Sequence, residues 1–256
     1  MIDALYISAT GLRGQQKHID TISNNVANLQ TPGFKKGQVN FVELTKHSAV
    51  DAVAAPTQAA AEGAGTRVAD IQTDFSTGDI KLTRNPLHVA IDGAGLLELV
   101  AADGSLRYSR SGQLKLDSEG FLAAANGLRL SAGIQIPEDA SELRIETNGE
   151  VSVRLANEIE RTVLGQLELA QINNPDALIA LGDSQYGLKN EEQMPTLGRP
   201  GELGLGLVQQ GFLEMSNVDL VDEMTSLVLA QRAYQLNARV LQASDQVLET
   251  INNLRR

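Results

Sequence analysis

The chain has 256 residues, of which 42% are hydrophobic and only 4% aromatic, and its sequence contains neither Cys nor Trp. This length allows one large domain or two smaller ones, while the lack of Cys excludes a disulfide framework and a thiolate metal site. The formal net charge of −11 argues against a nucleic-acid partner, because phosphate contacts require a surplus of Lys and Arg. No apolar run approaches the ~18 residues of a membrane span, and charges at Arg13, Lys17 and Asp20 do not fit a secretory signal peptide.

The N-terminal thirty residues predict a helix with a heptad repeat. Gly11 and Gly14 each lower its stability by about 1 kcal/mol relative to Ala, so the helix is expected to order only on assembly. The repeat indicates a coiled-coil seam, in which the polar Gln16 and Ser23 would specify the partner. Steps of three and four place eight positions in this seam: Ile2, Leu5, Ala9, Leu12, Gln16, Ile19, Ser23 and Val26.

A sharp stop is expected after this helix. The residue before Pro avoids the α region, so Thr31-Pro32-Gly33 should end the helix. Three amides, Asn24, Asn25 and Asn28, precede the stop, although Asn is a poor helix former. Residues 31–85 are then predicted to be a connector. Within it, residues 46–66 are rich in Ala, Gly and small polar residues, which indicates a flexible segment.

Residues 86–217 predict a β-rich domain, because short apolar runs alternate with Gly-containing turns between His88 and Ser131. The clearest hairpin spans residues 143–155. A two-residue loop would place a charge opposite an apolar residue there. A three-residue loop at 147–149 instead pairs Ile145 with Val151 and keeps one face apolar. We therefore predict the second register, with the loop glycine in a left-handed conformation.

Residues 218–256 predict a second heptad helix. Ser216, three residues before Asp219, predicts a capping box at its start. The seam would contain Leu220, Met224, Leu227, Gln231, Tyr234, Ala238, Leu241, Asp245, Leu248 and Asn252. A second apolar row lies beside it: Val221, Val228, Val240, Val247, Ile251 and Leu254. This stripe is too wide for one partner, which favours contacts with both the N-terminal helix and another subunit. The alternative is that both helices close one core within a monomer.

No motif nominates an active site. His18, His47 and His88 lack the spacing of metal ligands. The stretch GDSQYG at 182–187 has one residue too many for the GxSxG nucleophile motif. We therefore expect no catalytic residue, no cofactor and no metal, since an enzyme would need a pocket with convergent titratable groups.

Three long segments resemble the flagellar axial proteins, the family of rod and hook subunits. They occur in the family's order and cover nearly the whole chain. Two departures are conservative: Leu96-Leu97 replace the usual pair of Phe, and Tyr108-Ser109-Arg110 replaces Tyr-Thr-Arg. The segments are SATGLRGQQKHIDTISNNVANLQTPGFKK (8–36), VAIDGAGLLELVAADGSLRYSRSGQLKLDSEGFLAAANG (89–127) and GFLEMSNVDLVDEMTSLVLAQRAYQLNARVLQASDQVLETINNL (211–254). The length, without a large inserted outer domain, resembles the distal rod type more than the hook type, with the proximal rod types as the alternative.

The resemblance implies an α+β fold, in which N- and C-terminal heptad helices (1–30 with 218–256) pair as a coiled coil and carry the central β-rich domain. It implies a structural subunit of the bacterial flagellar basal-body rod, not an enzyme. Such subunits polymerise helically across the periplasm into a drive shaft, which encloses the export channel and transmits torque to the hook. Residues 46–66 would be a rod-type segment that stiffens the shaft. A non-flagellar β-domain binding protein, for example one for carbohydrates, is the alternative from another class.

The partners implied are other copies of the chain, proximal rod proteins, the hook protein, surrounding periplasmic and outer-membrane ring proteins, and the flagellar type III export machinery. Export by that machinery would explain the missing signal peptide. The assembly interface is expected along both helices and the turns beside them. Its candidate residues are Leu5, Leu12, Ile19, Asn24, Asn25, Val26, Asn28, Thr31, Gly33, Phe34, Ser216, Asn217, Val218, Gln231, Arg232, Tyr234, Asn237, Leu241 and Leu248.

Two groups among these residues carry specific expectations. In a packed tube the amides Asn24, Asn25 and Asn28 would be buried among neighbours, whereas the alternative is exposure at a fraying helix end. Phe34 would anchor the turn that follows. Arg232, beside the seam, would reach a neighbouring subunit, and the alternative is an exposed Arg of little energetic weight.

Overall fold

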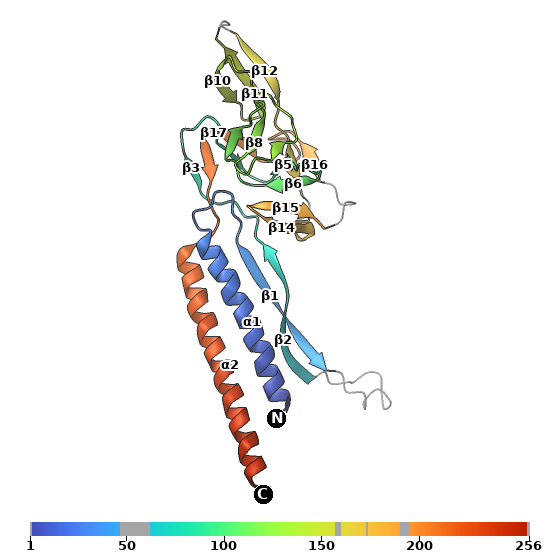
Figure 1. Cartoon of the computed structure of the whole chain (residues 1–256), viewed down its shortest axis with the longest axis vertical. Coiled ribbons are helices and arrows are strands. Elements are labelled where there is room, and N and C mark those ends of the chain that lie inside the picture. Colours follow the sequence, from blue (N-terminus) through green and yellow to red (C-terminus); the bar gives the residue numbers. More distant parts are fainter. Residues whose placement is uncertain (1, 47–61, 157–159, 173, 190–194, 255–256) are drawn as a thin grey trace, which may run out of the picture. The chain divides into compact units, whose positions relative to one another are not determined.

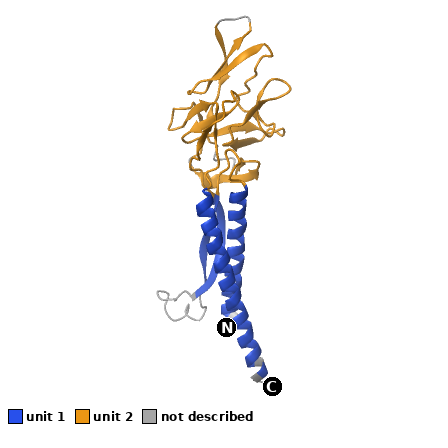
Figure 2. Ribbon diagram, turned by 90° about the vertical axis from the view of Figure 1, so that its left-hand side faces the viewer, with its two compact units in different colours: residues 1–27, 37–72, 219–256 blue, residues 28–36, 73–218 orange. Residues whose placement is uncertain are grey.

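The computed structural model describes residues 2–46, 62–156, 160–172, 174–189 and 195–254 (Figure 1). A long helix lies near each end of the sequence, and strands β1 to β18 lie between them, which confirms the α+β fold. The chain divides into two compact units, coloured in Figure 2. Unit 1 comprises residues 1–27, 37–72 and 219–256, and unit 2 comprises residues 28–36 and 73–218.

Unit 1 joins both ends of the sequence. It contains helices α1 (Ile2–Ala27) and α2 (Leu220–Leu254) and strands β1 (Gly37–Lys46) and β2 (Glu62–Thr73). Helix α1 packs against α2 and also against β1, and β1 pairs with β2 in a two-stranded sheet. The two predicted helices are therefore confirmed to within a few residues at each end.

The strands β1 and β2 were not predicted, because their residues were assigned to a connector. The first residues of β2 are rich in Gly and Ala, which have low strand propensity. Tertiary packing compensates for this: Ala64 is buried, and the backbone N–H of Thr66 donates to the hydroxyl of Thr10 on α1 (3.4 Å). Residues 47–61, most of the predicted flexible segment, lie outside the described residues.

The buried face of α1 is shifted from the predicted seam. Gln16 and Ser23 are exposed in the single chain and do not belong to this buried face, so their role toward a partner stays a prediction. The predicted apolar seam residues Leu5, Leu12 and Ile19 are only half-buried. Small and polar residues take the closest face, because α1 packs against two elements rather than one. The buried positions are Ser8, Gly11, Gly14, Thr21, Ile22 and Asn25.

Helix α2 shows a similar shift. Ala230 is its buried position, and Asn237 and Leu241 are half-buried. Gln231 and Asp245, predicted in the seam, are exposed. The predicted cap is also wrong, since Asp219 rather than Ser216 caps the helix: its Oδ1 accepts hydrogen bonds from the N–H groups of residues 221 (2.8 Å) and 222 (3.2 Å).

Unit 2 is built from several antiparallel sheets. Nine strands form the largest one, with the order β14–β15–β6–β5–β9–β8–β7 and with β13 joining β5 to β16. Its strands are β5 (Leu96–Val100), β6 (Leu106–Ser109), β7 (Leu114–Leu116), β8 (Leu122–Ala124), β9 (Arg129–Leu130), β13 (Leu169–Gln171), β14 (Leu178–Gly182), β15 (Gln185–Leu188) and β16 (Thr196–Gly198). A short 3-10 helix, η2 (Pro175–Ala177), precedes β14.

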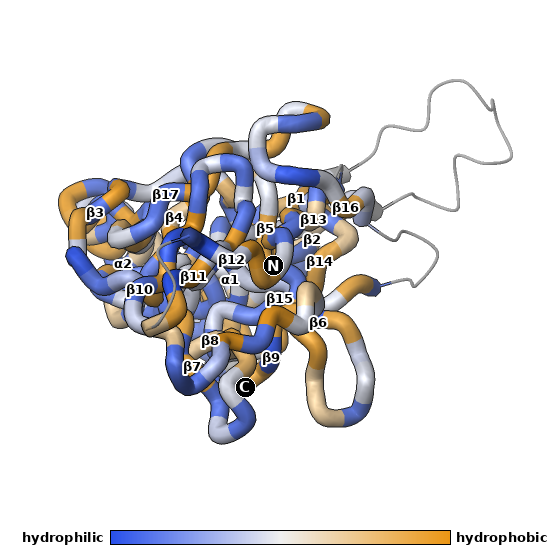
Figure 3. Tube along the Cα trace, turned by 90° about the horizontal axis from the view of Figure 1, so that it is seen from above, coloured by the Kyte–Doolittle hydropathy of each residue, from blue (hydrophilic) through white to orange (hydrophobic). Residues whose placement is uncertain are grey.

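Three smaller sheets complete unit 2. One contains β10 (Ala140–Ile145), β11 (Glu150–Leu155) and β12 (Arg161–Gln166). The other two are pairs: β17 (Leu207–Gln210) with β4 (Val89–Asp92), and β18 (Phe212–Glu214) with β3 (Ile80–Leu82). Hydrophobic and hydrophilic positions both occur along the chain (Figure 3). The apolar ones meet in a core whose fully buried members include Leu97, Leu99, Leu122, Val151 and Leu169.

The predicted hairpin register is confirmed. Ile145 pairs with Val151, and the next apolar pair is Leu143 with Val153. Gly149 has a φ of 86°, so the loop glycine adopts the left-handed conformation that the three-residue loop requires. The pattern of apolar residues was sufficient here because a shift by one residue would have moved a charge to the buried face.

Candidate assembly site

Two glycines let α1 approach its neighbours in unit 1. A Cβ atom on Gly11 would lie 2.9 Å from the Asn237 amide nitrogen of α2, and one on Gly14 would lie 2.9 Å from the Phe41 ring of β1. The glycines that weaken α1 as an isolated helix therefore bring it close to both partners. Asn237 was predicted to lie at the interface between subunits, but its side chain faces Gly11 within the same chain.

Asn25, one of the three asparagines near the end of α1, has a structural role. Its side chain is 2% exposed and binds the backbone of Gly37, the first residue of β1, in both directions. Asn25 Nδ2 donates to the Gly37 carbonyl (2.9 Å), and its Oδ1 accepts from the Gly37 N–H (2.9 Å). A weaker bond from Nδ2 reaches Glu223 of α2 (3.3 Å). Asn25 thus ties the end of α1 to β1, whereas its neighbour Asn24 is exposed.

A titratable ring lies on the same side of α1. His18 packs edge-on against Phe41 of β1, with ring centroids 5.8 Å apart. Burial lowers the pKa of His18, and the opposing charge of Glu223 reduces this effect only in part. The buried side of α1 therefore favours a neutral imidazole.

The predicted helix stop forms a compact turn in unit 2. The Thr31 N–H donates to the Asn28 carbonyl (3.0 Å), and its hydroxyl donates to the Asn28 side chain (3.1 Å). The N–H of the half-buried Phe34 then donates to the Thr31 carbonyl (3.2 Å). Gly33 has a φ of +70°, and a Cβ atom there would lie 2.5 Å from the backbone nitrogen of Ser111. The glycine is therefore required both by its conformation and by this close approach.

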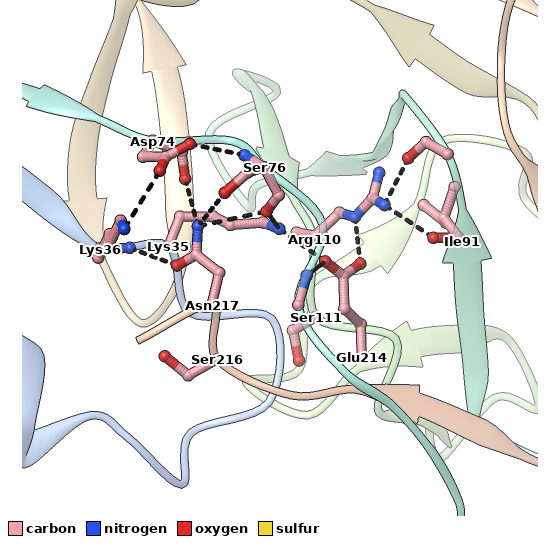
Figure 4. Close-up of polar contacts among 12 residues, drawn as sticks. Lys35, Lys36, Asp74, Ser76, Ile91, Arg110, Ser111, Glu214, Ser216 and Asn217 are labelled. Atoms are coloured by element: carbon pink, nitrogen blue, oxygen red, sulfur yellow. Dashed lines mark hydrogen bonds and ion pairs between the residues drawn. The ribbon is translucent and has the colours of Figure 1, made fainter. Parts of the chain in front are cut away.

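A buried ionic clamp follows this turn (Figure 4). We use the term clamp for Lys35, Arg110 and Glu214, whose side chains are at most 4% exposed. Glu214 accepts from Lys35 Nζ (2.6 Å) through Oε1 and from Arg110 Nε (2.5 Å) through Oε2. Removing one partner of such a pair typically costs about 3–5 kcal/mol, because the remaining charge stays buried.

Backbone groups satisfy the rest of the clamp. Arg110 also donates to the carbonyls of Ile91 (2.7 Å), Gly93 (2.6 Å) and Gly95, while Lys35 donates to the carbonyl of Ser76 (2.5 Å). Burial lowers the pKa of Lys35, and the hydrogen bond to the Glu214 carboxylate opposes this shift. The clamp contains two cations and one anion, so these carbonyl dipoles stabilise its surplus positive charge.

Asn217 joins the same segments through neutral hydrogen bonds. Its Oδ1 accepts from the N–H of Lys36 (2.8 Å), and its Nδ2 donates to the carbonyls of Asp74 (2.8 Å) and Ser76 (3.2 Å). Burial raises the pKa of Asp74, but hydrogen bonds from Ser76 and the charge of Lys36 outweigh it, and the net shift is downward. The hydroxyl of Ser216 is occupied locally, where it accepts from the N–H of residue 218 (3.3 Å).

Helix α2 carries a row of exposed apolar residues, which we call the apolar stripe. Their spacing of seven and four residues places them on one side of the helix. The stripe consists of Leu229, Leu236, Val240, Val247 and Ile251, each 46–63% exposed. Leu220, Val221, Met224 and Val228 add a second exposed apolar group near the start of the helix.

The structure brings only some of the predicted interface residues together. Gly33, Ser216 and Val218 are buried and Asn217 is half-buried in unit 2, and Asn25 and Asn237 bind within unit 1. Half-buried positions on the helices are Leu5, Leu12, Ile19, Val26, Leu241 and Leu248. Gln231, Arg232 and Tyr234 are exposed in the single chain. The three clamp residues were not predicted from the sequence, where only Glu214 lies between two apolar residues, Leu213 and Met215.

The described residues give little indication of a catalytic or ligand-binding pocket. They contain no group of three or more His, Asp or Glu that could hold a metal. None of the helices that the structure describes is long and apolar enough to cross a membrane. A small cavity of about 60 Å³ contains Glu98, Ser131 and Glu168 in its lining. Small-molecule sites typically occupy about 300–1,000 Å³.

Comparisons with known families place the chain among structural flagellar proteins. Residues 5–35 match the family "Flagella basal body rod protein". Residues 90–153 match the D1 domain of the flagellar hook protein FlgE/F/G family, and residues 209–254 match the C-terminal region of the flagellar basal body rod FlgEFG proteins. Each match contains one member of the clamp. The class is therefore that of the flagellar rod and hook proteins, which are structural subunits.

Full-length relatives narrow this class. The chain is 35% identical over 264 residues to the flagellar basal-body rod protein FlgG of Borreliella burgdorferi, with 100% of both chains covered. It is also 35% identical to FlgG of Bacillus subtilis, again with 100% of both chains covered. A flagellar hook-basal body complex protein of the latter organism, FlhP, is 30% identical over the whole length of both chains. The chain belongs to the FlgG family of flagellar basal-body rod proteins.

Proposed function

We propose that this chain is the structural subunit of the flagellar distal rod and that it polymerises helically through its two terminal helices. The apolar stripe on α2 carries the proposal. Soluble monomers rarely leave a continuous apolar row exposed, and such a row marks a protein interface. The buried face of α2 already packs on α1, so the stripe is available to a second copy of the chain. Membership of the FlgG family supports the same role.

We further infer that α1 and α2 pair as a coiled coil in the assembled rod. The terminal helical domain would comprise residues 1–30 and 218–256, followed by a connector at 31–85 and the central β-rich domain at 86–217. The heptad spacing of both helices and their contact in unit 1 support this pairing. Residues 46–66 would stiffen the rod, a role that follows from the resemblance to rod-type subunits.

The proposed location is the basal body, where the rod would cross the periplasm, enclose the export channel and transmit torque to the hook. The proposed partners are other copies of the chain, proximal rod proteins, the hook protein, the surrounding ring proteins and the flagellar type III export machinery. A scaffold of this kind needs no catalysis and no cofactor. Family membership supports each of these assignments.

The test compares Leu236→Gln in the apolar stripe with Leu116→Gln in β7. Leu236 is 61% exposed and Leu116 is 44% exposed, so neither change should alter monomer stability by more than about 0.5 kcal/mol. Each purified variant is mixed with growing rods, and rod lengths are scored by electron microscopy. Leu236→Gln should shorten the rods while Leu116→Gln leaves them unchanged. Rods of normal length from Leu236→Gln would contradict the proposal.

A further inference from the structure

The clamp joins parts of unit 2 that lie far apart in the sequence. Lys35 and Glu214 are separated by 179 residues, and Arg110 and Glu214 by 104 residues. Oε1 of Glu214 also accepts from the N–H of Gly78 (2.9 Å), which brings in the segment before β3. One carboxylate from the last fifth of the sequence therefore organises three distant segments.

Without Glu214, the positive charges of Lys35 and Arg110 would destabilise the closed arrangement of these segments. Lys35 and Arg110 are buried, with side chains 0% and 4% exposed, and Glu214 is the carboxylate that binds both. Closing unit 2 before Glu214 is in place would bury two cations near each other without the carboxylate that binds both, since Asp74 acts on Lys35 only as a weaker charge. The closed form is therefore disfavoured until Glu214 arrives.

The backbone around Glu214 strengthens this dependence. Its carbonyl accepts from the N–H of Gly33 (2.8 Å), and the next residue, Met215, donates to the carbonyl of Asp79 (2.8 Å). Strand β18 pairs with β3, and β17, just before it, pairs with the buried strand β4 over four residues. The same short C-terminal segment thus supplies both the charge and two strand partners.

We propose that the clamp is a folding lock: in the native chain, unit 2 closes as a whole only when the Glu214 carboxylate offsets the buried charges of Lys35 and Arg110. A chain whose last fifth is not yet available then keeps unit 2 open. This property would suit a subunit that is exported unfolded, so its biological use rests on the proposed function. The lock itself is a property of the single chain and does not depend on polymerisation.

The test is amide hydrogen exchange on the dilute full-length protein. Glu214→Gln keeps the shape of the side chain but removes its charge, and it should raise exchange in the central strands β5, β6 and β8 at least about 100-fold, together with exchange near residue 214. The matched control is Glu142→Gln, which removes the same charge from a half-exposed carboxylate that pairs with Arg154 and Arg161 (3.1 Å each), and it should leave these strands unchanged.

A charge-restoring variant keeps the test informative if Glu214→Gln does not fold. Lys35→Met together with Glu214→Gln returns the clamp to its original net charge, and it should recover much of the lost protection. Two results would overturn the proposal: an exchange increase confined to residues 30–36, 76–83 and 212–216, or no recovery in the double variant. Normal exchange in a variant that fails to form rods would reject the lock without rejecting the rod function.

Discussion

Gly33 and Gly104 provide a matched pair of substitutions in unit 2. Both glycines have left-handed backbone conformations, with φ values of +70° and +81°. A Cβ atom on Gly33 would lie 2.5–2.7 Å from backbone atoms of Ser111 and Arg110, whereas one on Gly104 would have no neighbour within 4 Å. Replacing each by Ala therefore separates the cost of the conformation from the cost of the contact.

The expected magnitudes differ accordingly. A left-handed Ala costs about 1 kcal/mol relative to Gly, and this applies to both positions. Overpacking against backbone that cannot move aside adds typically about 1–3 kcal/mol, and this applies to Gly33 alone. We expect Gly104→Ala to lower the free energy of unfolding by about 1 kcal/mol and Gly33→Ala by about 3 kcal/mol.

Urea unfolding of the full-length protein, followed by circular dichroism in the β-sheet region, measures both changes. With a slope of about 1–3 kcal/mol per molar urea, the two variants should differ in midpoint by roughly 1 M. Amide exchange in the strands of unit 2 gives an independent readout. Equal losses for the two variants would refute the argument, because the contact of Gly33 with residues 110 and 111 would then have no energetic weight.

Three further changes test other parts of the chain. Asn25→Ala removes the side chain that binds the N–H and carbonyl of Gly37, and it should lower the free energy of unfolding in urea by about 2–3 kcal/mol. The exposed control Ser23→Ala should change it by no more than about 0.5 kcal/mol, and equal effects of the two variants would contradict the role of Asn25. Arg232→Ala should spare monomer unfolding but stop rod growth, and normal rods would place this side chain in solvent in the assembly as well. Burial raises the pKa of Tyr186 to about 12, so the stability that its neutral hydroxyl contributes is complete below pH ~10 and is lost between pH ~10 and 12. Tyr186→Phe should make the free energy of unfolding fall less steeply over this pH range, and an unchanged pH profile would contradict this reasoning.

Much of the fold was predictable because its signals are local. Heptad spacing predicted both helices, and Gly-containing turns predicted the strands between His88 and Ser131. The hairpin register at 143–155 followed from keeping charges off one face. The two strands β1 and β2 were missed because their stability comes from pairing and from packing on α1, which local propensity does not reveal.

The side chains inside unit 1 were harder to predict, since the seam rule assumes one partner for each helix. Helix α1 packs against both α2 and β1, so Gly11 and Gly14 occupy the closest positions and the buried face moves by about one residue. Gln16 and Ser23, which the rule places in the seam, lie off this face and are exposed in the single chain. Packing against two elements favours small residues over the larger aliphatic ones that define the heptad.

The clamp was missed for a different reason: nothing in the local sequence links Lys35, Arg110 and Glu214. Each lies in a different matched region of the family, and only the fold brings them together. A charged residue inside an apolar stretch is a usable signal, because burying it alone would be too costly and a distant partner must exist. Glu214 fits this description, because it lies between Leu213 and Met215, whereas Lys35 is followed by a second lysine and Arg110 lies between two serines.

The buried charges of the clamp and the exposed apolar stripe stabilise the protein at different stages, the first on folding of the single chain and the second on contact with another surface. The clamp is satisfied within one chain, so its energy is available to a monomer and favours a single arrangement of the segments around it. The apolar stripe on α2 gains only part of its burial free energy in the monomer, because its residues are 46–63% exposed there. The rest becomes available when a second surface covers it. The proposed polymerisation through α2 would therefore depend on other interactions than the folding of unit 2, and we expect substitutions to affect one without the other.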